Sequence, residues 1–339
     1  MSHLAAVQPE PKALLEVQDV KTPQPGPDEL LIKNELIALV PIDAKQTKLA
    51  LFPSQYPAIH GTSYGGTVTA VGSDVTGFKV GDKVAAAKAG GAVGNKYGGF
   101  QEYVVSREAT ASKVPASVDL SIPVGLIGNL ASVVGLFNEH LGLGRPDPVG
   151  RASSNSKKIL VYGGTSSFGS LATQYVTQAG YQVVTTTSPP HKDLVAKLGA
   201  VHVVDHTQSQ DTIVKELVAQ GPYDYVVDSI SLNPTYDILS QVAAAQGGGK
   251  IYALLPAPDP SSIPEGVTAE CARWSAPLGK KENAELLKWA YGTYFPQAIA
   301  NDKLVTLHSQ RIAGGLGGLN KAIDALFKGV SGAKVVVEL

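Results

Sequence analysis

The chain has 339 residues, of which 44% are apolar and 17% charged, and its formal net charge is −1. This length favours two domains, and the lack of a basic block argues against nucleic acid as the main partner. No apolar run approaches the roughly 20 residues of a membrane span, and the N-terminus lacks the features of a secretory signal. Cys271 is the single cysteine, which excludes an intramolecular disulfide or a cysteine-rich zinc site and favours the cytoplasm.

Residues 1 to about 125 consist of short β-favouring runs between glycines and prolines. ELLIKNELIAL, GGTVTAVG and KVGDKVAAA are examples, and stretches that favour a helix are scarce. This part predicts a β-rich barrel or sandwich.

Strand and helix patterns alternate from residue 126 to about 295. KKILVYG is followed by the helical FGSLATQYVTQAG, then by the strand YQVVTTT and by six further segments that alternate between helix and strand. Such alternation implies βαβ crossovers and a parallel, doubly wound sheet. The polar segment 142–158 is expected to be an exposed loop. The last residues predict a helix at LNKAIDALFKG and a final strand at AKVVVEL.

The sequence YGGTSSFG, residues 162–169, lies where a dinucleotide would bind, between a strand and a helix. Two glycines allow the turn, a third allows close packing, and the two serine hydroxyls can either donate to phosphate oxygens or cap the helix. An ordinary helix cap is the alternative interpretation. The residues predicted to hold the cofactor here are Gly163, Gly164, Thr165, Ser166, Ser167, Phe168 and Gly169.

The end of the second predicted strand indicates which nucleotide binds. An NAD site usually has an acid there, whereas this chain has Thr185, Thr186, Thr187 and Ser188. Hydroxyls together with a cation suit a 2′-phosphate, so the pattern favours NADPH. Cofactor contacts are therefore also predicted for Ser188, His191 and Lys192, unless Lys192 simply faces solvent.

Two further stretches carry a family resemblance: GGTVTAVGSDVTGFKVGDKV, residues 65–84, and GGFQEYVV, residues 98–105. With the Rossmann half in this order, the chain resembles the medium-chain dehydrogenase/reductase superfamily. It is similar to the zinc-free branch with quinone oxidoreductases, enoyl and alkenal reductases and the fungal trans-acting enoyl reductases (the ToxD-like group). The resemblance implies an α/β chain with a GroES-like catalytic domain at 1–124 and 291–339, a Rossmann NADPH-binding domain at 125–290, and dimers.

Zinc enzymes of this superfamily carry a Gly-His-Glu motif and an early cysteine. Here His60 is followed by Gly61, Thr62 and Ser63, and no cysteine precedes Cys271. We therefore expect no metal and no simple alcohol oxidation. His60 is expected to pack or bond locally.

The segment VPIDAK, residues 40–45, matches the superfamily's N-P-x-D-x-K segment, which in relatives lies beside the nicotinamide. The resemblance implies a cofactor contact for Pro41 and makes Lys45 the best candidate to polarise a carbonyl or supply a proton. A surface lysine is the alternative. Asp43 is expected to be a structural hydrogen-bonding residue, and Val40 replaces the usual asparagine.

Other candidates remain open. Relatives place a threonine near the nicotinamide in the stretch that is GLIGNLASVVGLF here, so Asn129 or Ser132 could face the cofactor. A tyrosine acid of some relatives falls at Leu51–Phe52, so Tyr56 or Tyr64 would have to substitute. His206 is a candidate for the 2′-phosphate, with a plain surface histidine as its alternative, and Leu254 is a predicted cofactor contact at the end of the fifth strand.

The sequence thus predicts a zinc-independent NADPH reductase of an enone, an enal, an enoyl thioester or a quinone. Its substrate would be either free or tethered to a carrier of a polyketide synthase, and the enzyme either a homodimer or a monomer. The Pro-rich loop 257–267 could line the pocket. The alternative is a nucleotide-binding regulatory protein on the same fold with little or no turnover.

Overall fold

The computed structural model describes residues 1–150, 152–257 and 259–339, which form two compact units. Unit 1 joins Met1–Gly135 with Ser275–Leu339, and unit 2 comprises Leu136–Trp274. These bounds differ from the predicted 124/125 and 290/291 for a physical reason. Helix α2 (Ser121–Val134) is fastened to unit 1 by a 2.6 Å hydrogen bond from Ser63 Oγ to the Val124 carbonyl. Helix α7 (Ala284–Trp289) also packs within unit 1.

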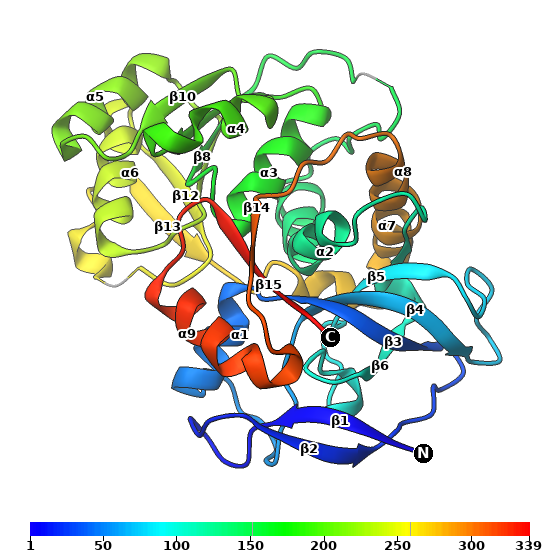
Figure 1. The fold of residues 1–339 in the computed structure, drawn as a ribbon. Coiled ribbons are helices and arrows are strands. Elements are labelled where there is room, and N and C mark those ends of the chain that lie inside the picture. The colour runs from blue at the N-terminus through cyan, green and yellow to red at the C-terminus, as the bar shows by residue number, and fades with distance from the viewer. Residues whose placement is uncertain (151, 258) are drawn as a thin grey trace. The chain divides into compact units, whose positions relative to one another are not determined.

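Unit 1 is built on a seven-stranded sheet (Figure 1) in the order β14-β15-β3-β4-β5-β7, with β6 paired to β3. A separate hairpin joins β1 to β2, and the long helices are α1, α2 and α9. The bounds are β1 (Ser2–Val7), β2 (Glu16–Lys21), β3 (Glu29–Ala38), β4 (Ser63–Val71), β5 (Lys83–Ala87), β6 (Tyr103–Arg107), β7 (Ala111–Lys113), β14 (His308–Arg311), β15 (Ala333–Glu338), α1 (Pro41–Leu49), α8 (Phe295–Ala300) and α9 (Leu319–Lys328).

The central strand β3 pairs with β4, β6 and β15, which explains its almost continuous apolar sequence. Leu30 and Ile32 of this strand pack with Val68 and Val84 in a core that water does not reach. The final strand β15 pairs antiparallel with β3, with Val336 opposite Ala38. The last strand of the chain therefore belongs to the same sheet as β3, which lies near the beginning of the chain.

Helix α1 was not expected from the sequence. Pro41 occupies its first turn, and the Asp43 carboxylate accepts the Val40 N–H at 2.9 Å, so the N-terminus is capped by its own third residue. The helix ends at Ala50, whose φ of 52° is left-handed.

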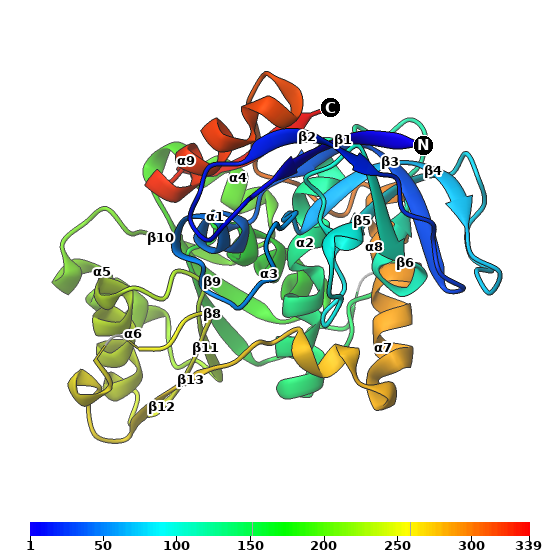
Figure 2. The ribbon, with the colours of Figure 1, turned by 90° about the horizontal axis from the view of Figure 1, so that it is seen from below.

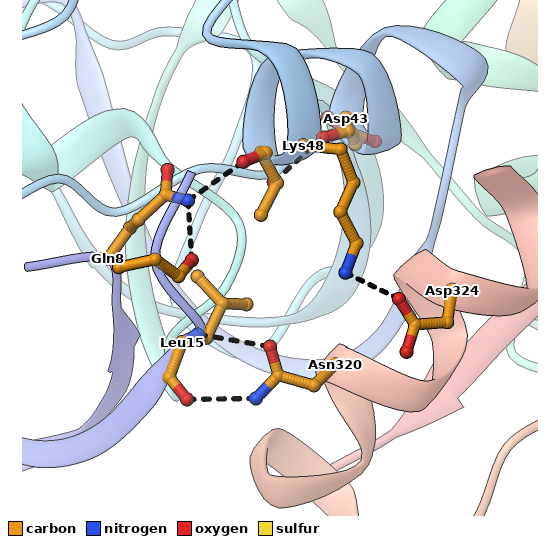
Figure 3. Close-up of polar contacts among 8 residues, drawn as sticks. Gln8, Leu15, Asp43, Lys48, Asn320 and Asp324 are labelled. Carbon is orange, nitrogen blue, oxygen red and sulfur yellow. Dashed lines mark hydrogen bonds and ion pairs between the residues drawn. The ribbon is translucent and has the colours of Figure 1, made fainter. Parts of the chain in front are cut away.

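Polar bonds join α1 to the elements beside it (Figure 3). Lys48 pairs with Asp324 of α9 at 2.5 Å, and Gln8 Nε2 donates to the Thr47 carbonyl at 2.9 Å. Figures 1 and 2 both show α1 and α9 side by side. The C-terminal half of α1 is therefore anchored independently of its N-terminus.

Unit 2 is a six-stranded parallel sheet in the order β10-β9-β8-β11-β12-β13, which is the doubly wound order expected from the alternating pattern. Figure 2 shows α5 and α6 side by side against it. The bounds are β8 (Lys158–Tyr162), β9 (Gln182–Thr187), β10 (His202–Asp205), β11 (Tyr225–Asp228), β12 (Gly249–Ala253), β13 (Val267–Cys271), α3 (Ser167–Gln178), α4 (Lys192–Lys197), α5 (Gln210–Gln220) and α6 (Asn233–Ala245).

The predicted loops are reproduced in part. Residues 142–150 and 152–157 contain neither helix nor strand, as expected, and Arg151 lies outside the described residues. The Pro-rich segment 257–267, whose Pro258 is likewise not described, holds a short 3-10 helix at Pro260–Ser262 and ends in β13, a sixth strand that the sequence did not indicate.

The expectation that no apolar run approaches the length of a membrane span was wrong for one helix. The helical stretch Ser121–His140 has 20 residues and contains an 18-residue window with a mean hydropathy of 1.5, enough by length and composition to cross a membrane. In the structure 67% of this window is buried. It has the character of a core helix, so it is weak evidence for a membrane span.

Candidate functional site

The loop between β8 and α3 forms a narrow backbone cradle. Gly163 has a φ of +91°, a conformation that favours glycine. A Cβ at Gly169 would lie 2.2 Å from the Gly163 carbonyl oxygen, and a Cβ at Gly164 would lie 2.4 Å from Thr185 Oγ1. These positions admit no side chain. The backbone is therefore free to approach a pyrophosphate at the N-terminus of α3, where first-turn N–H groups have no acceptor within the helix.

The Ser166 side chain caps the helix. Its Oγ accepts the Gly169 N–H at 2.8 Å and lies 2.9 Å from Ser229 Oγ, which in turn donates to the Tyr162 carbonyl at 2.5 Å. Of the two roles predicted for this serine, the structure therefore shows the capping role. Ser167 begins the helix, and Phe168 is buried beneath it.

The threonines at the end of β9 point mostly inward, which corrects their predicted role toward a 2′-phosphate. Thr185 donates to the Val161 carbonyl at 2.6 Å, and Thr186 Oγ1 accepts the Gly163 N–H at 2.9 Å. Thr187 Oγ1 lies 3.2 Å from Thr165 Oγ1. The Thr186 hydroxyl holds the glycine loop in place, and the Thr185 hydroxyl joins β9 to β8. Thr187 and Ser188 are left at the carboxyl end of the strand.

A groove of about 490 Å³ runs along the β10 edge of unit 2, lined by Thr187, Lys192 and Asp205 among others. Ser188, His191 and His206 lie at the same carboxyl ends of β9 and β10, where the His206 N–H donates to the Thr187 carbonyl at 3.2 Å. Hydrogen bonds from Thr207 lower the pKa of Asp205. Asp205 lines the same groove as Lys192, and nothing in the sequence pattern pointed to this carboxylate.

Leu254, the remaining predicted cofactor contact of unit 2, follows β12. Its N–H donates to Ser231 Oγ at 2.9 Å. Ser231 is in turn bound to Asp228, a buried carboxylate at the end of β11 whose pKa is raised by burial. The backbone at this strand end is thus fixed by a polar network.

Unit 1 gathers the residues predicted to surround the nicotinamide at the start of α1 and the middle of α2. A Cβ at Gly128 would lie 2.8 Å from Ser63 Cβ and 3.1 Å from Val40 Cγ1, so α2 lies directly against both segments. Asn129 and Ser132, one helical turn apart on α2, are both partly exposed. The alternative between them therefore stays open.

Lys45, on α1, is half-buried, and this burial lowers the pKa of its ammonium group. An amine that is partly shielded from water is a stronger hydrogen-bond donor and a better acid than a solvated one. Pro41, four residues earlier, is exposed at the start of the helix. Lys45 is partly shielded and still partly exposed, so both the proton donor and the surface lysine remain open as interpretations.

The two tyrosines proposed as substitute acids differ. Tyr64 is fully buried in the core of unit 1, its hydroxyl donates to the Val105 carbonyl at 3.4 Å, and burial raises its pKa. It cannot reach a substrate, so this suggestion was wrong. The Tyr56 hydroxyl is buried without a hydrogen-bond partner among the described residues, and its ring meets His60 edge-on at 6.4 Å.

His60 bonds locally, as expected. Its Nε2 lies 2.7 Å from Gln8 Oε1, and burial together with the Lys88 charge lowers its pKa to about 4. Within the described parts of the chain, no three His, Cys, Asp or Glu residues are grouped so that they could hold a metal ion.

Residues 26–116 match the family described as alcohol dehydrogenase GroES-like domain, and residues 168–272 match the family described as zinc-binding dehydrogenase. The chain is 32% identical over 314 residues to the trans-enoyl reductase himH of Aspergillus japonicus, which covers 92% of this chain and 90% of that protein. The chain belongs to the medium-chain dehydrogenase/reductase superfamily. Its place is in the enoyl reductase branch of these nicotinamide-dependent oxidoreductases, as the resemblance predicted.

Two other proteins extend the comparison. The enoyl reductase component lovC of lovastatin nonaketide synthase from Aspergillus terreus is 28% identical over 335 residues, with 92% of this chain and 89% of that protein covered. A mycobacterial protein, Rv1454c, solved in complex with NADPH, has a TM-score of 0.75 at 23% identity and covers all of this chain. The second comparison confirms the two-domain fold class.

Proposed function

We propose that the protein is a zinc-independent, NADPH-dependent reductase of activated double bonds. The observation that carries this proposal is the glycine cradle between β8 and α3, where a Cβ at Gly169 would lie 2.2 Å from a backbone oxygen. Such close backbone at a helix N-terminus suits a pyrophosphate. When bound, reduced nicotinamide supplies a hydride to the acceptor.

The chain's own residues supply the rest of the chemistry. Lys45 donates to the carbonyl oxygen of an enone, enal, enoyl thioester or quinone and stabilises the negative charge that develops there. Its lowered pKa favours this role. Asn129 or Ser132 of α2 would orient the reacting groups.

The preference for NADPH rests on the carboxyl end of β9, which carries Thr187 and Ser188 and no acid. Lys192 lies on the same groove and supplies a positive charge for a 2′-phosphate. The negative charge of Asp205 on that groove disfavours a 2′-phosphate, so the preference for NADPH depends on Lys192.

Replacing Lys192 with alanine is expected to remove the discrimination between the two nucleotides. The wild type should bind NADPH at least about tenfold more tightly than NADH, which corresponds to about 1.4 kcal/mol. The Lys192→Ala variant should lose this difference in affinity while it binds NADH as tightly as the wild type. Asp205→Asn should increase the difference. Fluorescence titrations measure both affinities.

Lys197→Ala is the matched control, because Lys197 lies at the opposite end of the same helix α4. Equal NADPH affinity in the wild type and in Lys192→Ala would contradict the assignment of the 2′-phosphate to this groove.

The similarity to himH and lovC supports a substrate tethered as a thioester to a polyketide synthase. We propose that the protein acts in trans on such a chain, in the cytoplasm and as a homodimer. The test is the rate with a carrier-bound enoyl thioester against the free thioester. A carrier-bound substrate that reacts no faster would contradict the partnership.

One observation favours a second candidate, a nucleotide-binding regulator. Val40 stands where the N-P-x-D-x-K segment of relatives has an asparagine, which removes an amide from the predicted nicotinamide side. The decay of NADPH absorbance with a panel of enones, enals, enoyl thioesters and quinones separates the two. Tight NADPH binding without turnover of any acceptor would support the regulator and contradict the reductase.

A further inference from the structure

Asp43 lies at a junction of unit 1 that the proposed reaction does not itself use. One of its carboxylate oxygens accepts the Val40 N–H at 2.9 Å, and the other accepts the Thr62 hydroxyl at 2.6 Å. The side chain is 3% exposed. Asp43 therefore ties the N-terminus of α1 to the segment before β4 through two buried hydrogen bonds.

A buried carboxylate requires positive charge close by, since burial alone favours its neutral form. Burial does raise the pKa of Asp43, while the hydrogen bonds and the charges of Lys334 and Lys88 act in the opposite direction. Lys88 follows β5, and its N–H donates to the Thr62 carbonyl at 2.8 Å. Lys334 comes from β15, near the end of the chain.

Lys334 is the more deeply placed of the two lysines, with only 2% of the residue exposed. Its stem lies against α2, because a Cβ at Gly125 would be 3.7 Å from Lys334 Cγ. The adjacent Val335 carbonyl accepts the Leu39 N–H at 2.9 Å, just before α1. Lys334 thus lies close to α1 and α2, the two helices that carry the predicted catalytic residues.

We propose that Lys334 is a positioning residue: its buried ammonium group keeps Asp43 charged and thereby fixes the N-terminus of α1, which carries Pro41 and Lys45. As a role in catalysis, this inference rests on the proposed reductase function. The Asp43 bonds hold the start of α1, and the Lys48–Asp324 pair holds its end (Figure 3).

The protonation of Lys334 makes this arrangement sensitive to pH. Burial lowers the pKa of its ammonium group to about 7, although the Asp43 charge acts in the opposite direction. Above that pH the amine becomes neutral, and Asp43 keeps only the charge of Lys88, whose own pKa is also lowered by burial. The hydrogen bonds that hold α1 should then weaken, so the rate should fall as the pH rises.

Other charged groups on the elements packed against β15 are exposed or bonded to partners of their own, and α2 carries none. On α1, Lys45 is half-buried and Lys48 pairs with Asp324. The remaining groups are Glu29, Lys33 and Glu35 on β3, His308 and Arg311 on β14, Lys321, Asp324 and Lys328 on α9, and Glu338 on β15.

The experiment measures kcat and the NADPH dissociation constant between about pH 6 and pH 9 in the wild type, Lys334→Arg, Lys334→Met and Lys334→Met/Asp43→Asn. Lys334→Met should lower kcat at pH 6 at least about tenfold while NADPH affinity falls much less, because the glycine cradle between β8 and α3 is left intact and of the predicted cofactor contacts only Pro41 lies on α1. The double variant should recover part of this loss, because no buried carboxylate is left unpaired. Lys321→Met, at an exposed residue of α9, is the control.

The pH profile separates positioning from simple support of the fold. In the wild type kcat should decline above about pH 7, whereas Lys334→Arg should hold its rate to higher pH, because arginine stays charged. A wild-type profile in Lys334→Met, or an unshifted profile in Lys334→Arg, would overturn the proposal. The arginine variant also decides the matter if Lys334→Met does not fold.

The same samples distinguish this proposal from the proposed function. If none of the acceptors leads to oxidation of NADPH by the wild type, the proposed reductase function is wrong. Amide hydrogen exchange at Val40 then tests the role of Lys334 by itself. Protection of that amide should fall above about pH 7 in the wild type and persist in Lys334→Arg. Equal protection in both proteins at every pH would overturn the positioning role.

Discussion

Gly169→Ala is expected to weaken NADPH binding by at least about 100-fold, or about 2.7 kcal/mol. The added Cβ would lie 2.2 Å from the Gly163 carbonyl oxygen and 2.9 Å from Ser166 Oγ. The clash involves the backbone, which cannot rotate away as a flexible side chain would. The loop must therefore move out of the conformation that offers its N–H groups to a pyrophosphate.

Calorimetric titration of NADPH measures this effect. Gly144→Ala is the matched control in unit 2, because a Cβ there would lie 3.8 Å from the Tyr181 hydroxyl, an ordinary contact. Without nucleotide, both variants should still unfold in one cooperative transition. The unfolding temperature of Gly169→Ala should be lower only by the amount that the local strain at residue 169 causes. Unchanged NADPH affinity in Gly169→Ala would mean that the cradle is only a turn and a helix cap.

Lys45→Met is expected to lower kcat about 100-fold or more, in the range typical of a lost acid or charge-stabilising group. NADPH affinity should be nearly unchanged, because the substitution leaves the β8–α3 loop intact. Lys48→Met on the same helix is the control. Its partly exposed pair with Asp324 contributes at most about 1 kcal/mol to stability, so kcat should change little.

The pH dependence of Lys45 has a definite sign. Lys45 acts in its protonated form, and burial lowers its pKa from the ordinary value for lysine. In Lys334→Arg, where the decline assigned to Lys334 is removed, the rate should therefore be full at low pH and fall as the pH rises through the lowered pKa of Lys45, a decline that Lys334→Arg/Lys45→Met lacks. Stopped-flow measurements of NADPH oxidation follow both profiles. An identical alkaline decline in Lys334→Arg/Lys45→Met would assign the acid elsewhere, with Tyr56 as the next group to test.

The architecture of unit 2 was predictable because its signals are local. The strand β8, the glycine turn and α3 follow one another within one stretch of sequence, and each later βαβ crossover repeats the pattern. The loop residues were also placed correctly at the junction. What the pattern could not give was the direction of the hydroxyls, since Thr185 and Thr186 bond to neighbouring backbone instead of facing outward.

Helix α1 escaped prediction because its stability does not come from an apolar face. Asp43, Gln46 and Thr47 are all buried polar residues, and each is satisfied by a specific hydrogen bond. A periodicity argument counts such residues as exposed. The burial of Lys334 was not predictable for a similar reason: the strand AKVVVEL was predicted, but its lysine is covered by elements far away in the sequence, since β15 pairs with β3 and the lysine stem lies beside Gly125 of α2.

The most direct test of the central claim is the fate of the hydride. Wild-type protein is incubated with NADPH that carries deuterium at both C4 positions of the nicotinamide and with an enone or enoyl thioester, and the product is analysed by mass spectrometry and NMR. A reductase of activated double bonds places one deuterium at the β-carbon of the saturated product. NADPH that binds but keeps its deuterium with every acceptor would contradict the account.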